Sequence, residues 1–435
     1  MMHDGQILEW LKNLPLKAQS HAKTSIVSRK RRRAPPTPDS SDSAMPSSRG
    51  GSPNKRMRRM VEYGDTSEQE TPRATKIRAQ TPSSSRGSIP HLSSESASQD
   101  SRASGRTSPR KHLLVLEGRN DGIRIQDLAG LQHPDLKLQA FLKMMRNISR
   151  GRGILPRSMQ PATLLGVDPA FLEIAEDDAC FSDEREKAGP CPALESVLEA
   201  LEAAIECSEN LHAESTWNIE VHQKLLGLAF RPSGQSKFSH SVNFTSCSTA
   251  TILSEYLPAF SPSKKVDFCI YVDPSAVLEG RKSINLRAHS VNPTDYYPLR
   301  NRLLAVCIET KKPGEGWEGA TLQLSVWKAA QWKIIEELEK FKQHKLASES
   351  PVDANAGRQL EQDMPQFVPG IIIQGHDWNI VVATREGAQT VLWNKLTIGS
   401  TSSVMGIYQI IYALHVLRDW CQQTYWSYIY QAITI

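Results

Sequence analysis

Hydrophobic residues change their spacing several times along this chain, and the changes predict where helices and strands lie. Between residues 192 and 230 they recur at every third or fourth position, as in "ALESVLEALEAAIE", which predicts amphipathic helices. Further on, "VDFCIYV" (266–272) and "LLAVCIET" (303–310) are short apolar runs rich in β-branched residues, which predict buried strands. From 320 to about 345 the helical spacing returns.

The remaining patterned segments complete a succession of helices and strands. "LKLQAFLKMMRNI" (136–148) predicts a helix, and the acidic stretch 173–186 is expected to be a solvated connector. After a polar linker, "GIIIQ", "WNIVVAT" and "TVLWNKL" predict antiparallel strands joined by turns, and a last helix is expected over roughly 404–424. This order of elements predicts an α/β or α+β body.

Composition divides the chain into four regions. Residues 17–110 are rich in Ser, Pro, Arg and Thr and poor in aliphatic residues, so they bury too little apolar surface to offset the entropy of ordering. We expect a short helical segment at 1–16, a disordered basic tail at 17–110, a helical lead-in with an acidic connector at 111–190, and the main domain at 191–435.

The tail and the body carry net charges of opposite sign. Residues 1–110 hold 20 Lys and Arg against 10 Asp and Glu, whereas residues 111–435 hold 32 against 37. Two clusters in the tail have the composition of nuclear-import signals or nucleic-acid contacts: Arg29, Lys30, Arg31, Arg32 and Arg33, and Lys55, Arg56, Arg58 and Arg59. We expect a nuclear protein that engages an import receptor through this tail. A solvated charge run is the alternative.

Cysteine usage and hydropathy favour an intracellular protein. None of the seven cysteines belongs to a C-x-x-C pair, and the N-terminus has no apolar signal-peptide core. The most apolar late segment, "VMGIYQIIYALHVL", is shorter than the roughly 20 residues of a membrane span. We therefore expect no membrane segment, and the oligomeric state stays open.

The stretch "ETKKPGEGWEGATLQL" (309–324) is compatible with two different chemistries. Its centre, GEGWEG, has the glycine spacing of a dinucleotide-binding turn, in which backbone N–H groups and a helix N-terminus bind pyrophosphate. Two carboxylates in this turn, Glu315 and Glu318, would repel a diphosphate. The glycines are better explained by the turn from strand to helix. A nucleotide-using enzyme is therefore only a third hypothesis.

The start of the same stretch predicts a metal site. Glu309 and Lys311 lie two residues apart on a predicted strand, so their side chains project from one face. Asp267 begins the other buried strand, and pairing of the two strands would bring its carboxylate to Glu309. With the Thr310 backbone carbonyl, these oxygens suit Mg²⁺ or Mn²⁺. Lys311 could then stabilise charge on a phosphate or act on an attacking water. A structural salt-bridge cluster is the alternative.

This constellation resembles the PD-(D/E)XK nuclease superfamily, and most of all its nuclease-like domain in fungal proteins. The matching segments are "WNIEVH", "KKVDFCIYV", "AVCIETKKPGEGWEGATLQLSVWKAAQW", "PGIIIQGHDWNIVVAT" and "IGSTSSVMGIYQIIYALHVLRDW". The resemblance implies a restriction-endonuclease-like αβββαβ core with extra helices. It also implies that Asp267 and Glu309 are metal carboxylates and that Lys311 is the catalytic lysine.

Further site residues follow from the resemblance. Gln323 matches a glutamine that many members carry on the next helix near the site, whereas Trp327 stands where a tyrosine is usual. An upstream helix often contributes another acid, for which Glu214 is the first choice and Glu220 the second. His222, close by, could line the same face as these acids, although a buried structural histidine is the preferred interpretation.

The resemblance implies Mg²⁺- or Mn²⁺-dependent hydrolysis of nucleic-acid phosphodiester bonds, with DNA the favoured substrate. Lys265 and Lys312 are the expected nucleic-acid contacts, and Lys264, Arg300 and Arg302 would extend the same basic rim. The alternative function is a catalytically inactive nuclease fold that serves as a nuclear DNA- or protein-binding module.

Overall fold

The computed structural model describes residues 108–159, 177–276, 291–349 and 364–434. All of these residues belong to one compact unit. The predicted helical segment at 1–16 and both basic clusters of the tail lie outside the described residues.

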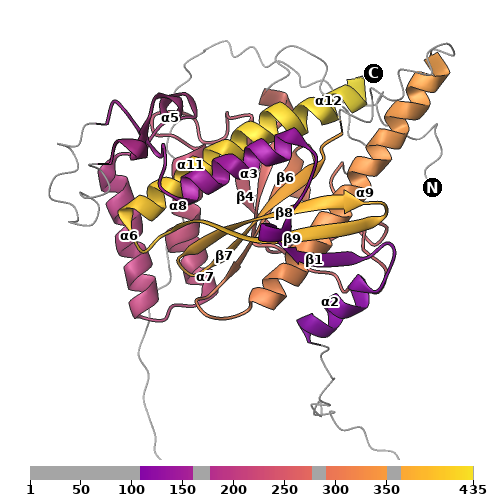
Figure 1. The fold of residues 1–435 in the computed structure, drawn as a ribbon, viewed down its shortest axis with the longest axis horizontal. Helices are drawn as coiled ribbons and strands as arrows, with labels where there is room; N and C mark the ends of the chain where they lie inside the picture. The colour runs from indigo at the N-terminus through magenta and orange to yellow at the C-terminus, as the bar shows by residue number, and fades with distance from the viewer. Residues whose placement is uncertain (1–107, 160–176, 277–290, 350–363, 435) are drawn as a thin grey trace, which may run out of the picture. The chain divides into compact units, whose positions relative to one another are not determined.

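A seven-stranded mixed sheet forms the centre of the fold (Figure 1). Its strands are β1 (Ile123–Asp127), β4 (Val242–Ser246), β5 (Phe268–Val272), β6 (Leu303–Lys311), β7 (Phe367–Gln374), β8 (Asp377–Glu386) and β9 (Gln389–Ser400). Their spatial order is β1-β9-β8-β7-β6-β5-β4. The pairs β1–β9 and β6–β7 are parallel, and the other neighbours are antiparallel. A second, two-stranded sheet joins β2 (Leu155–Pro156) to β3 (Phe181–Ser182).

The described residues also form helices, which pack on this sheet, on the small sheet or on one another. They are α2 (Pro109–Glu117), α3 (Leu136–Ser149), α5 (Asp183–Lys187), α6 (Leu194–Glu209), α7 (Glu214–Trp217), α8 (Gln223–Phe230), α9 (Trp317–Glu349), α11 (Val404–Trp420) and α12 (Ser427–Thr434). Two π-helical segments, Asn218–His222 and Cys421–Trp426, join α7 to α8 and α11 to α12. Single 3-10 turns occur at Leu128–Gly130, Asp178–Cys180, Pro274–Ala276 and Tyr297–Leu299.

The helices pack on particular strands. α9 packs against β6 and β7, and α11 packs against β9 and α8. Figure 1 shows α3 running beside α11 and α12 across one face of the sheet. Among the described residues, no helix has both the length and the apolar character needed to cross a membrane.

Most of the predicted elements are confirmed. α3, α6 and α9 cover the helical ranges expected from the sequence, and β5 and β6 are the two expected buried strands. β7, β8 and β9 form the expected antiparallel set, and α11 with its π-helical extension is the expected late helix. The mixed α/β architecture is the predicted fold class.

Several elements were not expected from the sequence, among them the strands β1 and β4 and the helix α5. β1, "IRIQD", and β4, "VNFTS", lack the long apolar run that identified β5 and β6, because both lie at edges of the sheet. The described part of the acidic connector contains α5 instead of a continuous loop. The Ser182 hydroxyl accepts the Glu184 N–H at 3.1 Å, and the carboxylates in the first turn favour a helix N-terminus.

The described chain starts at a helix cap. The Ser108 hydroxyl accepts the Lys111 N–H at 3.3 Å, and Pro109 is the first helical residue of α2. Both features are typical of helix starts. The expected end of the tail at residue 110 therefore falls inside the first turn of α2.

Buried polar side chains fix α9 along β6. The Gln331 amide donates to the carbonyls of Leu304 and Ala305 at 3.1 and 3.0 Å, and it accepts from Lys328 Nζ at 3.0 Å. Lys328 and Gln331 are both fully buried, and burial lowers the pKa of Lys328. These bonds set the position of α9 relative to the strand that ends in Glu309, Thr310 and Lys311.

His415 makes the stability of the fold depend on pH. It lies on α11, is fully buried, and its Nε2 contacts the Ala229 carbonyl at 3.2 Å. Burial, together with the charges of Arg185 and Arg418, lowers its pKa to about 3. In the unfolded chain, histidine binds its proton near pH 6.5, so acid favours unfolding between these two values.

We predict that His415 alone lowers the free energy of unfolding by about 2 kcal/mol when the pH falls from 7 to 5. Urea denaturation at both pH values would measure this in the wild type, His415→Gln and His344→Gln, which alters an exposed histidine. The pH-dependent loss should shrink in His415→Gln and stay unchanged in His344→Gln. An equal pH dependence in all three proteins would contradict a neutral, buried His415.

Candidate active site

The pairing of β5 with β6 brings two strand ends to one edge of the sheet. The strands are antiparallel with Phe268 opposite Ile308, so the start of β5 lies beside the end of β6. The Asp267 N–H donates to the Ile308 carbonyl at 3.1 Å, and the Asp267 carbonyl accepts the Cys247 N–H at 2.8 Å. Asp267 and Glu309 therefore lie at the same edge.

Thr310 holds the Asp267 carboxylate. Asp267 Oδ2 accepts from both the Thr310 N–H and the Thr310 hydroxyl, each at 2.9 Å. Thr310 is fully buried, so both donors are fixed in place. The sequence pointed only to the Thr310 carbonyl, since nothing in the spacing of residues tells where a threonine hydroxyl points.

The ammonium group of Lys311 lies among three oxygens. Its Nζ donates to Glu309 Oε1 at 2.5 Å and to the Thr310 carbonyl at 2.6 Å, and Glu214 Oε2 is 3.5 Å away. Glu214 is the first residue of α7, so an upstream helix contributes a carboxylate to this edge. The structure thus brings Glu214, Glu309, Thr310 and Lys311 into one cluster beside Asp267.

Glu309 is a buried carboxylate with one unsatisfied oxygen. The residue is 1% exposed, and its Oε2 has no hydrogen-bond partner among the described residues. Burial and the nearby charge of Asp267 raise the pKa of Glu309 to about 8, against the opposing effect of Lys311. Burial likewise raises the pKa of Glu214. A cation at this edge would favour the ionised form of both carboxylates.

The residues of the cluster meet part of the ligand requirement of a hard divalent cation. Within the described residues, no group of three or more His, Cys, Asp and Glu side chains is arranged to hold a metal ion by itself. Mg²⁺, however, uses one or two carboxylates and keeps several waters. Asp267, Glu309 and the Thr310 carbonyl provide that set, and the unsatisfied Glu309 Oε2 is a free acceptor for it. Lys311 Nζ shows that a positive charge is stabilised between these oxygens.

Of the two upstream acids, only Glu214 lies at this cluster in the structure. Glu220 is exposed and pairs with Lys224 Nζ at 3.4 Å. The two acids are separated by the start of the π-helical segment Asn218–His222, a distortion that is frequent at functional sites.

His222 has a structural role, as expected. It is fully buried, and its Nδ1 contacts Asn218 Oδ1 at 2.9 Å while Nε2 contacts the Gly375 carbonyl at 3.4 Å. Burial lowers its pKa to about 4, so the ring is neutral at physiological pH. The Gly375 N–H donates to the Lys311 carbonyl at 2.8 Å. His222 therefore supports the turn after β7 that fixes the end of β6.

Gln323 and the two expected nucleic-acid contacts, Lys265 and Lys312, lie in the segments that flank the cluster along the chain. The Gln323 amide donates to the Lys265 carbonyl at 2.9 Å, so it is directed at the backbone before β5. The Lys265 side chain is exposed, and Lys312 Nζ pairs with Glu315 Oε2 at 3.2 Å.

The two arginines of the expected basic rim lie elsewhere. Arg300 and Arg302 precede the first residue of β6, whereas Lys311 is its last, so the length of the strand separates them from the cluster. Arg302 Nε pairs with Asp273 Oδ2 at 3.1 Å.

The glycine-rich segment forms the turn between β6 and α9. Gly314 and Gly316 have φ angles of +75° and +77°, a region that favours glycine. A Cβ atom at position 316 would lie 2.6 Å from Lys311 Cδ. Gly316 therefore leaves room for the Lys311 side chain, which explains the glycine without any bound phosphate.

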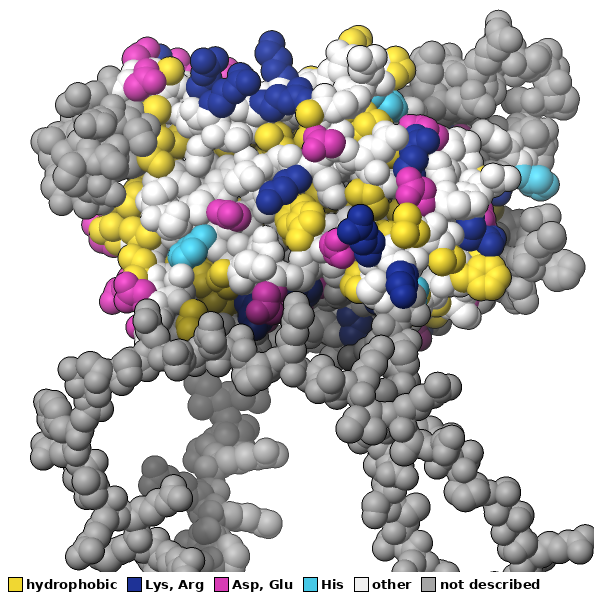
Figure 2. Space-filling view, turned by 60° about the horizontal axis from the view of Figure 1, so that its bottom comes forward, with side chains coloured by type: hydrophobic (Ala, Val, Ile, Leu, Met, Phe, Trp, Pro, Cys, Tyr) yellow, Lys and Arg dark blue, Asp and Glu magenta, His cyan; other side chains and the backbone are white. Residues whose placement is uncertain are grey.

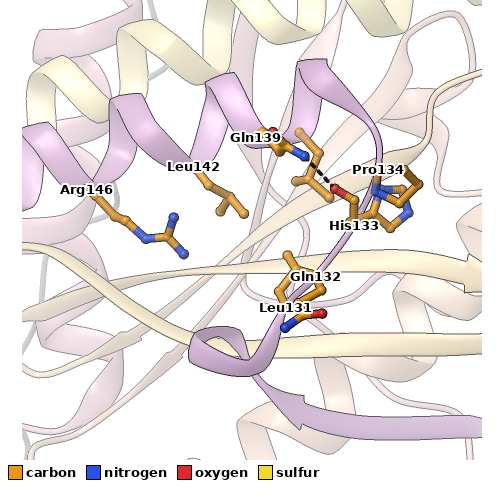
Figure 3. A pocket seen from close by; sticks show the side chains of 8 residues that line it. Leu131, Gln132, His133, Pro134, Gln139, Leu142 and Arg146 are labelled. Carbon is orange, nitrogen blue, oxygen red and sulfur yellow. Dashed lines mark hydrogen bonds between the residues drawn. The ribbon is translucent and has the colours of Figure 1, made fainter.

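A cavity of about 620 Å³ lies apart from this edge, between the loop at 131–134 and α3 (Figure 3). Gln139 Nε2 donates to the His133 carbonyl at 2.8 Å at its rim, and Arg146 lies at the other end. None of its lining residues is a carboxylate. The cavity therefore lacks the carboxylates that a Mg²⁺ site uses.

One of three comparisons with known proteins identifies a family for this chain. The family model of the PD-(D/E)XK nuclease superfamily matches residues 167–426, which is more than half of the chain and includes the whole cluster. A search of curated proteins found no match, and a search of solved structures found none either. The chain therefore belongs to the PD-(D/E)XK nuclease superfamily.

Proposed function

We propose that this protein is a metal-dependent nuclease that hydrolyses phosphodiester bonds of nucleic acid, with DNA as its substrate. The observation that carries the proposal is the convergence of Glu309, the Thr310 carbonyl and Lys311 Nζ beside Asp267. Ionisable groups at buried strand ends are costly unless they serve one another or a ligand. Membership of the superfamily supports the same chemistry.

In this function Asp267, Glu309 and the Thr310 carbonyl hold Mg²⁺ or Mn²⁺. When bound, the cation supplies positive charge to the phosphate oxygens and lowers the pKa of a bound water. Thr310 keeps the Asp267 carboxylate oriented through its N–H and its hydroxyl. Glu214 adds negative charge at the open side of the cluster, where its side chain is 36% exposed.

Lys311 acts as a fixed cation. Burial opposes its charge, but Glu309, Glu214 and Asp267 outweigh this effect and raise its pKa above the ordinary value. A lysine that keeps its proton at neutral pH stabilises the negative charge that develops on the phosphate oxygens. It is poorly suited to accept a proton from water while these carboxylates surround it.

Nucleic-acid attraction is proposed to come from the tail and from a few local lysines. The face shown in Figure 2 has Lys and Arg side chains interspersed with Asp and Glu, in keeping with a body that is net negative. Lys264, Lys265 and Lys312 lie in the segments next to Asp267 and Lys311. The basic clusters of the tail add charge for non-specific, salt-dependent binding and for nuclear import.

A second candidate function is an inactive nuclease fold that binds DNA or protein in the nucleus. The observation that favours it is the ion pair between Lys311 and Glu309, which compensates the charge of Glu309 without a metal. Within the described residues, no three His, Cys, Asp or Glu side chains lie close enough together to hold a metal ion by themselves.

Replacing Lys311 should distinguish an active nuclease from an inactive nuclease fold. We predict that Lys311→Ala lowers Mg²⁺-dependent cleavage of plasmid DNA at least about 100-fold, because a fixed cation beside the phosphate is lost. Lys312→Ala is the matched control, since that side chain is 51% exposed and is paired with Glu315. It should weaken DNA binding in a salt-dependent way and leave the rate at saturating DNA within about tenfold.

Cleavage of plasmid and single-stranded DNA with Mg²⁺, Mn²⁺ or EDTA provides the measurement. A wild-type protein that cuts neither DNA with either metal would favour the inactive fold. Cleavage that persists in Lys311→Ala would contradict the role assigned to this lysine.

The turn glycines provide a second prediction. Gly316→Ala should lower cleavage because its Cβ displaces the Lys311 side chain, whereas Gly314→Ala should not, because nothing lies within 4 Å of the added atom. Both positions have positive φ, so both substitutions should cost about 1 kcal/mol of stability. Thermal unfolding and cleavage rates of the two variants test this. Equal rates in both variants would show that Lys311 does not depend on the space at Gly316.

A further inference from the structure

The segment that leads into β5 is held by two side chains of α9. Trp327 Nε1 donates to the Lys264 carbonyl, and Gln323 Nε2 donates to the Lys265 carbonyl, each at 2.9 Å. Residues four apart on a helix lie on the same face, so the two donors form one row along α9. They bind two consecutive carbonyls immediately before Val266 and Asp267.

Apart from α9, the residue after β4 also bonds to the end of this segment: Cys247 Sγ donates to the Val266 carbonyl at 3.5 Å, and the Cys247 N–H donates to the Asp267 carbonyl at 2.8 Å. Residues 261–266 have no regular secondary structure, and β5 begins only at Phe268. Val266 is buried at 1% exposure, and the Asp267 N–H reaches the Ile308 carbonyl. The two bonds from α9 therefore restrain the chain on one side of Asp267, while β6 restrains it on the other.

α9 is also fixed to β6, the strand that carries the other half of the site. Gln331, one turn beyond Trp327, donates to the carbonyls of Leu304 and Ala305. Trp327 itself is fully buried. The same helix thus holds both the strand of Glu309 and the segment of Asp267, which sets the separation between the two carboxylates.

We infer that Trp327 and Gln323 are positioning residues that place the Asp267 carboxylate at the active site by binding the backbone of Lys264 and Lys265. Their donors are directed to those carbonyls and not to the reacting atoms. The indole N–H of Trp327 performs this task although a tyrosine is usual at its position. The effect on cleavage rests on the proposed nuclease function, whereas the effect on Asp267 does not.

Tryptophan variants on one helix give a matched test. Trp327→Phe removes the indole N–H that binds Lys264, whereas Trp332→Phe removes an indole N–H that has no partner among the described residues. Both tryptophans are fully buried on α9, so both variants lose a similar volume. Gln323→Leu removes the second donor at a partly exposed site, and it decides the question if Trp327→Phe fails to fold.

Hydrogen exchange of the amides of Asp267 and Thr310 is the readout, because Thr310 N–H donates to Asp267 Oδ2. Exchange at these amides should be about tenfold faster in Trp327→Phe and Gln323→Leu, as expected for losing one hydrogen bond, and unchanged in Trp332→Phe. Exchange that is the same in Trp327→Phe and Trp332→Phe, or unchanged in Gln323→Leu, would overturn the inference.

Cleavage kinetics add a second readout. Where the wild type cleaves DNA, Trp327→Phe and Gln323→Leu should lower kcat about tenfold with little change in KM, since a misplaced ligand affects the chemical step. Trp332→Phe should keep the wild-type kcat. If the exchange results hold but the wild type cleaves no DNA under any metal, the positioning role stands and the nuclease function fails.

Discussion

A carboxylate buried at the end of a central strand has to take up a proton or be compensated by positive charge, and this requirement organises the site. Glu309 is almost completely buried, and one of its oxygens has no hydrogen-bond partner within the described residues. An uncompensated charge in such a place would be strongly destabilising. Lys311 provides one compensation in this structure, and a divalent cation held with Asp267 would provide another.

The surrounding fold serves the placement of these few groups. Thr310, on β6, orients the Asp267 carboxylate through its hydroxyl. Gly316 leaves space for the aliphatic part of the Lys311 side chain, and the Gly375 N–H donates to the Lys311 carbonyl. α9 holds both β6 and the segment before β5 through side-chain bonds to backbone carbonyls. Because these bonds come from one helix, the geometry of the site depends on how that helix packs on the sheet.

The sequence predicts the strands and their ends better than it predicts contacts. The β-branched runs of β5 and β6 are apolar throughout because both strands are buried, so they stand out from their surroundings. Asp267, Glu309 and Lys311 were singled out because charged residues at the ends of such runs are conspicuous. β1 and β4 were missed since short edge strands with polar residues leave a weak pattern.

Side-chain partners are set by packing over long sequence separations, which spacing does not encode. The bond of Gln323 to Lys265 spans 58 residues, and the bond of Trp327 to Lys264 spans 63. The hydroxyl of Thr310 and the free volume at Gly316 are likewise properties of the packed site. Family resemblance indicated the residue types at the site. Only the three-dimensional arrangement shows which side chain donates to which carboxylate or backbone carbonyl.

The central claim is that Glu309 and Asp267 bind a divalent cation beside Lys311, and Mn²⁺ binding tests it most directly. Electron paramagnetic resonance titration of the full chain with Mn²⁺ measures free and bound ion without any need for catalysis. The account predicts one bound Mn²⁺ per chain. Glu309→Gln should lower the Mn²⁺ affinity by at least the roughly 10- to 100-fold effect that is typical of losing a residue that only supports a metal ligand. No bound ion in the wild type, or equal affinity in both proteins, would contradict it.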